Sequence, residues 1–115
     1  MQYALLIYED ESVFGPHKAG PELQQVVARH MNFTKELGKT RIGGAGLKAT
    51  SSATTVRTSA GKQTVHDGPW AETKEQLGGL YIIEAPDLDA AIAIAKKVPL
   101  LEDGAIEIRP VLGPG

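Results

Sequence analysis

Residues 3–8 are apolar at every position, with the sequence YALLIY. A short apolar run of aliphatic and aromatic residues is typical of a β-strand buried on both faces. Side chains alternate along an extended strand, so residues 3, 5 and 7 line one face and residues 4, 6 and 8 line the other. Any fold of this chain must therefore cover both faces of this strand.

Two predicted helices supply a cover for one face. Between Pro21 and Gly38 the apolar residues recur along one helical stripe, so we expect a helix that begins with a proline and ends at a glycine. Asp87 is a suitable N-cap for a second helix, which we expect to end at Pro99. Further strands are expected at residues 47, 54–57, 63–65, 80–84 and 105–111, with a hairpin turn at 60–61 and a loop over 66–76.

This order of strands and helices indicates an α+β fold of the ferredoxin-like class, a split βαβ unit with an antiparallel sheet. Both helices then pack on the same face of the sheet. The other face is still apolar, and the sequence offers no third helix to cover it. We expect the sheet of a partner chain there, which gives a homodimer, a dimeric α+β barrel with a cavity between the two sheets.

The composition fits one such domain over residues 1–115, since 42% hydrophobic and 23% charged residues argue against disorder. A net charge of −2 without a basic block gives nucleic acid nothing to bind directly. The absence of cysteine excludes disulfides, thiolate catalysis and cysteine metal sites. The apolar runs are too short for a signal peptide or a membrane span, so we expect a cytoplasmic location and no membrane partner.

A polar loop with the sequence HDGPWAETKE covers residues 66–75, and its Gly-Pro pair restricts its shape. Such a loop can present an acid or base beside an aromatic wall, so Asp67 is the first candidate for catalysis and Trp70 for the wall. Glu72 and Lys74 are further ligand-binding candidates. The alternative is that Asp67 caps the turn and that the other charged residues are only solvated.

Charged residues also lie on the predicted strands. Glu107 and Arg109 share the face that the helices leave open, so in a dimer they enter the cavity, where Arg109 is suited to hold a carboxylate. The alternative is a salt bridge on an exposed edge strand. Arg57 lies on a middle strand and is either a ligand for an anion or an exposed charge.

His30 lies in the apolar stripe of the first predicted helix. Burial would lower its pKa and keep it neutral, and its ring could reach Tyr8 or a backbone carbonyl, as a catalytic group or as a satisfied core residue. The three histidines of the chain lack the spacing of a metal site. We expect no metal and no cofactor, and a metal would need a cluster formed only by the tertiary structure.

The chain resembles the YCII-related, DGPF-domain family. The resemblance is carried by the opening YALLIY, by TTVR at residues 54–57, by DGPWAETKE at 67–75 and by EIRP at 107–110. Trp70 stands where the family name has phenylalanine. The resemblance implies a dimeric α+β barrel and, in enzymatic relatives, acid–base chemistry around a His–Asp pair, whereas DGPF-type members accompany extracytoplasmic-function sigma factors.

Two functional hypotheses follow. The first is a small-molecule-binding protein, acting as an acid–base enzyme on a small carboxylate-bearing metabolite in the dimer cavity. Asp67 would be the base and His30 or His66 the acid or orienting group, with ligand contacts from Arg109, Arg57, Tyr8, Trp70, Glu72 and Lys74. The second is a regulatory module that binds a protein partner linked to a sigma factor.

Overall fold

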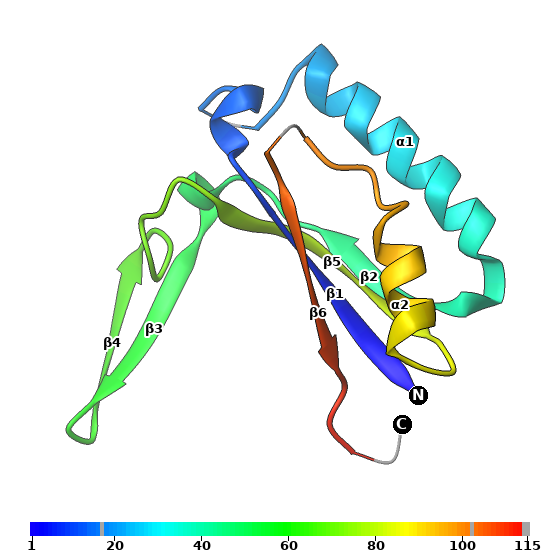
Figure 1. Cartoon of the computed structure of the whole chain (residues 1–115). Coiled ribbons are helices and arrows are strands. Elements are labelled where there is room, and N and C mark those ends of the chain that lie inside the picture. The colour runs from blue at the N-terminus through cyan, green and yellow to red at the C-terminus, as the bar shows by residue number, and fades with distance from the viewer. Residues whose placement is uncertain (17, 102, 114–115) are drawn as a thin grey trace.

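Four antiparallel strands form the main sheet of the computed structural model, which describes residues 1–16, 18–101 and 103–113 (Figure 1). The strands lie in the order β2-β5-β1-β6, and a separate hairpin pairs β3 with β4. Two helices, α1 and α2, lie on one side of the sheet. The bounds are β1 Gln2–Glu9, α1 Pro21–Leu37, β2 Arg41–Gly46, β3 Thr54–Ser59, β4 Lys62–Asp67, β5 Gln76–Glu84, α2 Leu88–Ala95 and β6 Ala105–Pro110, with short 3₁₀ turns at Glu11–Phe14, Gly38–Thr40 and Thr50–Ser52.

This arrangement confirms the predicted α+β class and its antiparallel sheet. The central strand is β1, which pairs with β5 on one side and β6 on the other. With the β3–β4 hairpin set aside, the strand order is that of a split βαβ unit. The hairpin is an insertion between the second and third strands of that unit.

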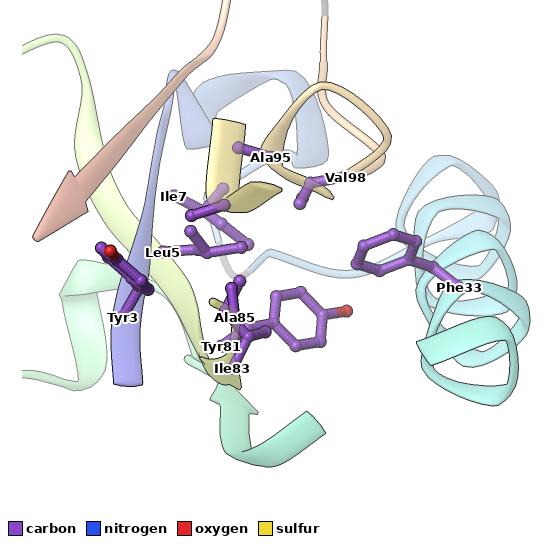
Figure 2. Packing of buried hydrophobic residues seen from close by; sticks show 10 residues of the cluster. Tyr3, Leu5, Ile7, Phe33, Tyr81, Ile83, Ala85, Ala95 and Val98 are labelled. Atoms are coloured by element: carbon purple, nitrogen blue, oxygen red, sulfur yellow. The ribbon is translucent and has the colours of Figure 1, made fainter. Parts of the chain in front are cut away.

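The hydrophobic core lies between the sheet and the two helices (Figure 2). Residues of β1 alternate between buried and half-buried, as the pleat of a central strand requires. Leu5 pairs with Tyr81 on β5 and with Ile108 on β6, and Leu5 and Ile83 are completely buried. Burying one such side chain contributes about 1.5–3 kcal/mol. Phe33 of α1 and the small residues of α2 complete the core.

Local signals explain where the helices begin and end. Pro21 opens α1, and Gly38, with a φ of 53°, ends it in the left-handed region. The carboxylate of Asp87 accepts a hydrogen bond of 2.8 Å from the backbone amide of Ala90, which caps α2 as expected. The second helix ends at Ala95, earlier than predicted, and the chain continues in turns up to Pro99, where the amides of Lys97 and Val98 donate to the carbonyls of Ile94 and Ala95.

The hairpin turn lies at Ala60 and Gly61, as predicted, and both residues have positive φ. That conformation is typical of a tight two-residue turn whose twist matches the strands. Two boundaries differ from the predictions. Residues 66 and 67 belong to β4, and β5 begins at Gln76, so the polar loop covers only residues 68–75.

The prediction for the region around residue 47 was wrong, since the strand there is β2, which ends at Gly46. Its sequence RIGGAG has little intrinsic preference for a strand. It pairs closely with β5, and a Cβ on Gly44 would lie 2.6 Å from the carbonyl oxygen of Leu80. The close approach of the two strands therefore requires glycine, and tertiary pairing determines the strand.

The face of the sheet that the helices leave open, here called the outer face, carries Ala4, Leu6, Tyr8, Leu80 and Ile82, all half-buried. Register places two charged residues of β6 on the same face, in pairs with Leu6 and Ala4. The β3–β4 hairpin lies on the side of the sheet away from the helices (Figure 1). The outer face is therefore apolar at its centre and only partly covered within one chain.

Replacing Gly44 by alanine is expected to lower the free energy of unfolding by about 1–3 kcal/mol, as overpacking does. The added Cβ meets the Leu80 carbonyl, and the φ of 155° is unfavourable for alanine. Gly46→Ala is the matched control, because a Cβ at Gly46 meets nothing within 4 Å. Urea denaturation of both variants checks this, and equal stabilities would contradict the assigned contact between β2 and β5.

Candidate functional site

A pocket of about 620 Å³ lies between α1 and the β2–β5 edge of the sheet. Three glycines, Gly46 of β2 and Gly78 and Gly79 of β5, line its sheet side. Register places Gly44 and Gly46 of β2 and Gly79 of β5 on the helix-facing side, next to Tyr81. The volume lies in the range of pockets that hold small organic ligands.

The helical wall of the pocket is apolar. It is formed by Leu23, Val26, Val27 and Met31 of α1. Val27 and Met31 are 47% and 60% exposed, although they lie on the helix side that faces the pocket. Apolar side chains around a concave opening supply affinity for an apolar ligand.

His30 and Tyr81 form a hydrogen-bonded pair in this pocket. The Nδ1 atom of His30 lies 2.7 Å from the hydroxyl oxygen of Tyr81, and the two rings are stacked with centroids 5.8 Å apart. Phe33 packs edge-on against the Tyr81 ring at 5.4 Å. Figure 2 shows the Tyr81 ring directed from β5 toward α1. Packing from both elements therefore fixes the position of the pair.

Burial favours the neutral form of both partners. It lowers the pKa of His30, and the positive charges of Arg29 and Lys18 lower it further. Burial also raises the pKa of Tyr81. At neutral pH the pair is therefore a neutral imidazole and a neutral phenol. The Tyr81 hydroxyl donates to Nδ1 in one tautomer of His30 and accepts from it in the other.

Five charged residues also line the pocket: Glu9, Lys18, Lys35, Arg41 and Lys48. The guanidinium of Arg41 lies 5.9 Å from the centre of the Tyr81 ring and donates a hydrogen bond of 3.2 Å to the Gly44 carbonyl. Its Nε atom is buried and has no hydrogen-bond partner among the described residues. Lys18 donates to the Leu47 carbonyl at 2.7 Å. Glu9 is buried at the end of β1.

This combination has a clear chemical capacity. Apolar walls hold the body of a ligand, a half-buried guanidinium can bind an anionic group, and a neutral imidazole–phenol pair can give or accept a proton. The pocket is therefore the candidate functional site of the chain.

Of the predicted site residues, His30 lies in this pocket. Its predicted lowered pKa is confirmed, although the residue is only half-buried, and its partner is Tyr81. Tyr8 cannot be that partner, because alternation along β1 places Tyr8 on the outer face. Sequence reasoning did not identify Tyr81 as this partner.

The predicted residues of the polar segment lie elsewhere. His66 and Asp67 are exposed on β4 of the hairpin, and Arg57 on β3 lies 5.4 Å from the centre of the Trp70 ring. Trp70 is 66% exposed. None of these side chains lines the pocket under α1.

The other predicted residues occupy two further places. Glu72 and Lys74 line a second hollow near Asp10. Arg109 lies on the outer face, where its Nε donates to a carboxylate oxygen of Glu107 at 2.9 Å, and this contact raises the pKa of Arg109. Within one chain the structure therefore does not gather Asp67, Arg109 and a histidine around the α1 pocket.

Sequence reasoning missed Glu9, Lys18 and Arg41. A signal existed for Glu9, because extending the alternation of β1 by one residue places it on the helix-facing side. No signal existed for Arg41, since the glycine-rich segment after it gave no indication of a strand.

Among residues 1–16, 18–101 and 103–113, no three His, Asp or Glu side chains gather as ligands for a metal ion. Neither helix described here has the length and apolarity needed to cross a bilayer.

Comparison with known proteins gives a family and one curated relative. The sequence matches the YCII-related domain over residues 1–113. It is also 40% identical over 118 aligned residues to an uncharacterized protein of Rhizobium meliloti (strain 1021), a match that covers 96% of this chain and 92% of that protein.

Lowering the pH from neutral toward about 5 is expected to destabilise the protein through His30. Its pKa is lower in the folded state than the ordinary value of 6.5, so the unfolded chain takes up the proton first. The contribution of neutral His30 to the free energy of unfolding is complete above pH 6.5 and is lost as the pH falls through the folded-state pKa.

His30→Gln cannot take up this proton, so it should flatten that part of the stability profile, measured by urea denaturation across pH at one protein concentration. A profile that runs parallel to that of the wild type would contradict the assignment.

Proposed function

The chain belongs to the YCII-related domain family, and we propose that it binds a small carboxylate-bearing organic molecule in the pocket under α1. The observation that carries this proposal is the pocket itself, which holds the 2.7 Å His30–Tyr81 pair between apolar walls. A concave apolar pocket with a few convergent polar groups is the usual form of a small-molecule site.

Arg41 supports the assignment of a carboxylate. Its guanidinium is half-buried, lines the pocket and forms no ion pair with a described carboxylate. Its Nε atom is buried without a partner among the described residues, so the guanidinium beside the pocket keeps unused donor capacity. Planar guanidinium groups bind carboxylates in a specific, charge-assisted geometry.

The His30–Tyr81 pair supports acid–base chemistry on the bound molecule. With the proton of His30 on Nδ1, the imidazole donates to the Tyr81 oxygen, and the phenol O–H is free to donate toward a ligand. With the proton on Nε2, the Tyr81 hydroxyl donates to Nδ1, and its oxygen is free to accept from the ligand. Tyr81 is thus the group that faces the ligand, and His30 is its proton partner.

We further propose that the chain is a homodimer in which the outer faces of two sheets pack together. The apolar centre of the outer face supports this, since an antiparallel sheet with two apolar faces needs a cover on each. The hairpin supports it as well. Val56 and Val65 form a direct cross-strand pair and are 62% and 67% exposed, and a lone hairpin is only marginally stable in water.

In such a dimer the hairpin of one chain lies beside the outer face of the other. Asp67 and His66 of one chain could then approach Arg109 and Tyr8 of the other, and the catalytic role predicted for Asp67 depends on this assembly.

The exposed hairpin also favours the competing hypothesis, a regulatory module that binds a protein linked to a sigma factor. In that case the chain would be a monomer whose hairpin is required for capture of the sigma factor.

Octanoate, a simple apolar carboxylate, is expected to bind saturably at one site per chain in isothermal titration calorimetry. Arg41→Gln should weaken this binding by about tenfold, the effect of losing a hydrogen bond to a charged group. Arg57→Gln is the matched control, because Arg57 lies on the hairpin outside the pocket, and it should leave the affinity unchanged. No binding, or a loss with Arg57→Gln alone, would contradict the proposed site.

Light scattering during gel filtration is expected to give a mass of two chains for the wild type. Leu6→Glu places a charge at the centre of the outer face and should yield a folded monomer, because burying an unpaired charge is unfavourable. Val13→Glu, at an exposed apolar residue outside that face, should leave the dimer intact. A wild-type monomer would overturn the proposed assembly.

A further inference from the structure

Glu9 is the one buried charged residue in the described part of the chain, with an exposed fraction of 6%. It follows Ile7 on the helix-facing side of β1 and lines the pocket under α1. Its Oε1 atom has no hydrogen-bond partner among the described residues. A residue that lines the pocket therefore has one buried carboxylate oxygen that the described residues leave without a partner.

Such an arrangement is unfavourable for folding alone. Native proteins pair nearly all buried polar atoms, because an unpaired one loses its water without compensation. Burial also raises the pKa of Glu9, although a backbone hydrogen bond from Leu101 and the charges of Lys18 and Arg29 act in the opposite direction. A role in recognising a ligand explains why an acid is placed here.

We infer that Glu9 anchors a hydroxyl group of the ligand, and this inference rests on the proposed function of the pocket. A hydroxyl donates one hydrogen bond to the carboxylate and brings no charge. Lys18 in the same pocket and Arg29 on α1 already provide positive charge around Glu9. A ligand ammonium group would meet these two cations, so a neutral donor suits the site better.

The two polar ends of the pocket lie well apart. Arg41 and Tyr81 form one end, and Leu5 is the β1 residue that pairs with Tyr81. Glu9 lies four residues beyond Leu5 on the same strand, a separation of about 13 Å between their Cα atoms at the usual rise per residue. The ligand class that fits is therefore an elongated hydroxy acid, with its carboxylate near Arg41, an apolar body under α1 and its hydroxyl at Glu9.

Calorimetric titration of the full chain with octanoate, ω-hydroxyoctanoate and ω-aminooctanoate tests this inference. The ω-hydroxyl is expected to tighten binding by about tenfold, as a hydrogen bond to a charged group does, whereas the ω-amino group should give no gain. In Glu9→Met, an unbranched apolar replacement, the advantage of the hydroxyl should disappear while octanoate still binds. Glu36→Gln, at an exposed position of α1, is the control and should keep the full advantage.

The outcomes separate the two proposals. Binding of octanoate without any gain from the hydroxyl, or a gain that survives in Glu9→Met, overturns the role of Glu9 and leaves the proposed function intact. Failure of all three compounds to bind overturns the proposed function and this inference with it. A greater gain from the ω-amino group overturns the assignment of a neutral donor.

Stability provides a second readout. If Glu9 serves a ligand and not the fold, Glu9→Gln should raise the thermal unfolding midpoint at neutral pH, because it removes a buried charge and keeps an acceptor for the Leu101 amide. Its advantage should shrink at acid pH, where Glu9 takes up a proton. A lower midpoint for Glu9→Gln at neutral pH would show a structural role and overturn the inference.

Discussion

The β2–β5 edge of the sheet depends on glycines that let the two strands approach closely. Gly44 and Gly79 are required by this approach, since a Cβ on either would lie within 3 Å of a backbone oxygen. Gly79 also lines the pocket under α1, together with Gly46 of β2. The backbone constraint that completes the sheet therefore also forms part of the pocket wall.

Burial then determines the chemistry of that pocket. An imidazole and a phenol that are partly removed from water stay neutral and share a hydrogen bond, because burial disfavours both the imidazolium and the phenolate. Glu9 and Arg41 each keep one buried polar atom without a partner among the described residues. Among the described residues, these are the two buried side-chain nitrogen or oxygen atoms that lack a hydrogen bond, and both belong to residues that line the pocket.

Sequence patterns revealed the fold because its main signals are local. Each of these signals predicts a single local structure: the apolar run of β1, the apolar stripe of α1, the cap at Asp87 and the turn at Ala60–Gly61. The strand β2 was not predicted at its true position, because its pairing with β5 is determined by tertiary contact. The site was not predicted for the same reason. His30 could be placed on its helix from the sequence, but Tyr81, Arg41 and Glu9 can be placed in the same pocket only when the register of three strands is known.

The location of the site can be tested by following the imidazole proton resonances of the intact protein in NMR spectra during a titration with octanoate. The account places His30 in the pocket and His66 on the exposed hairpin. The ring resonances of His30 should therefore shift saturably with octanoate, while those of His66 stay in place. A saturable shift of His66 with no response from His30 would move the site away from α1 and contradict this account.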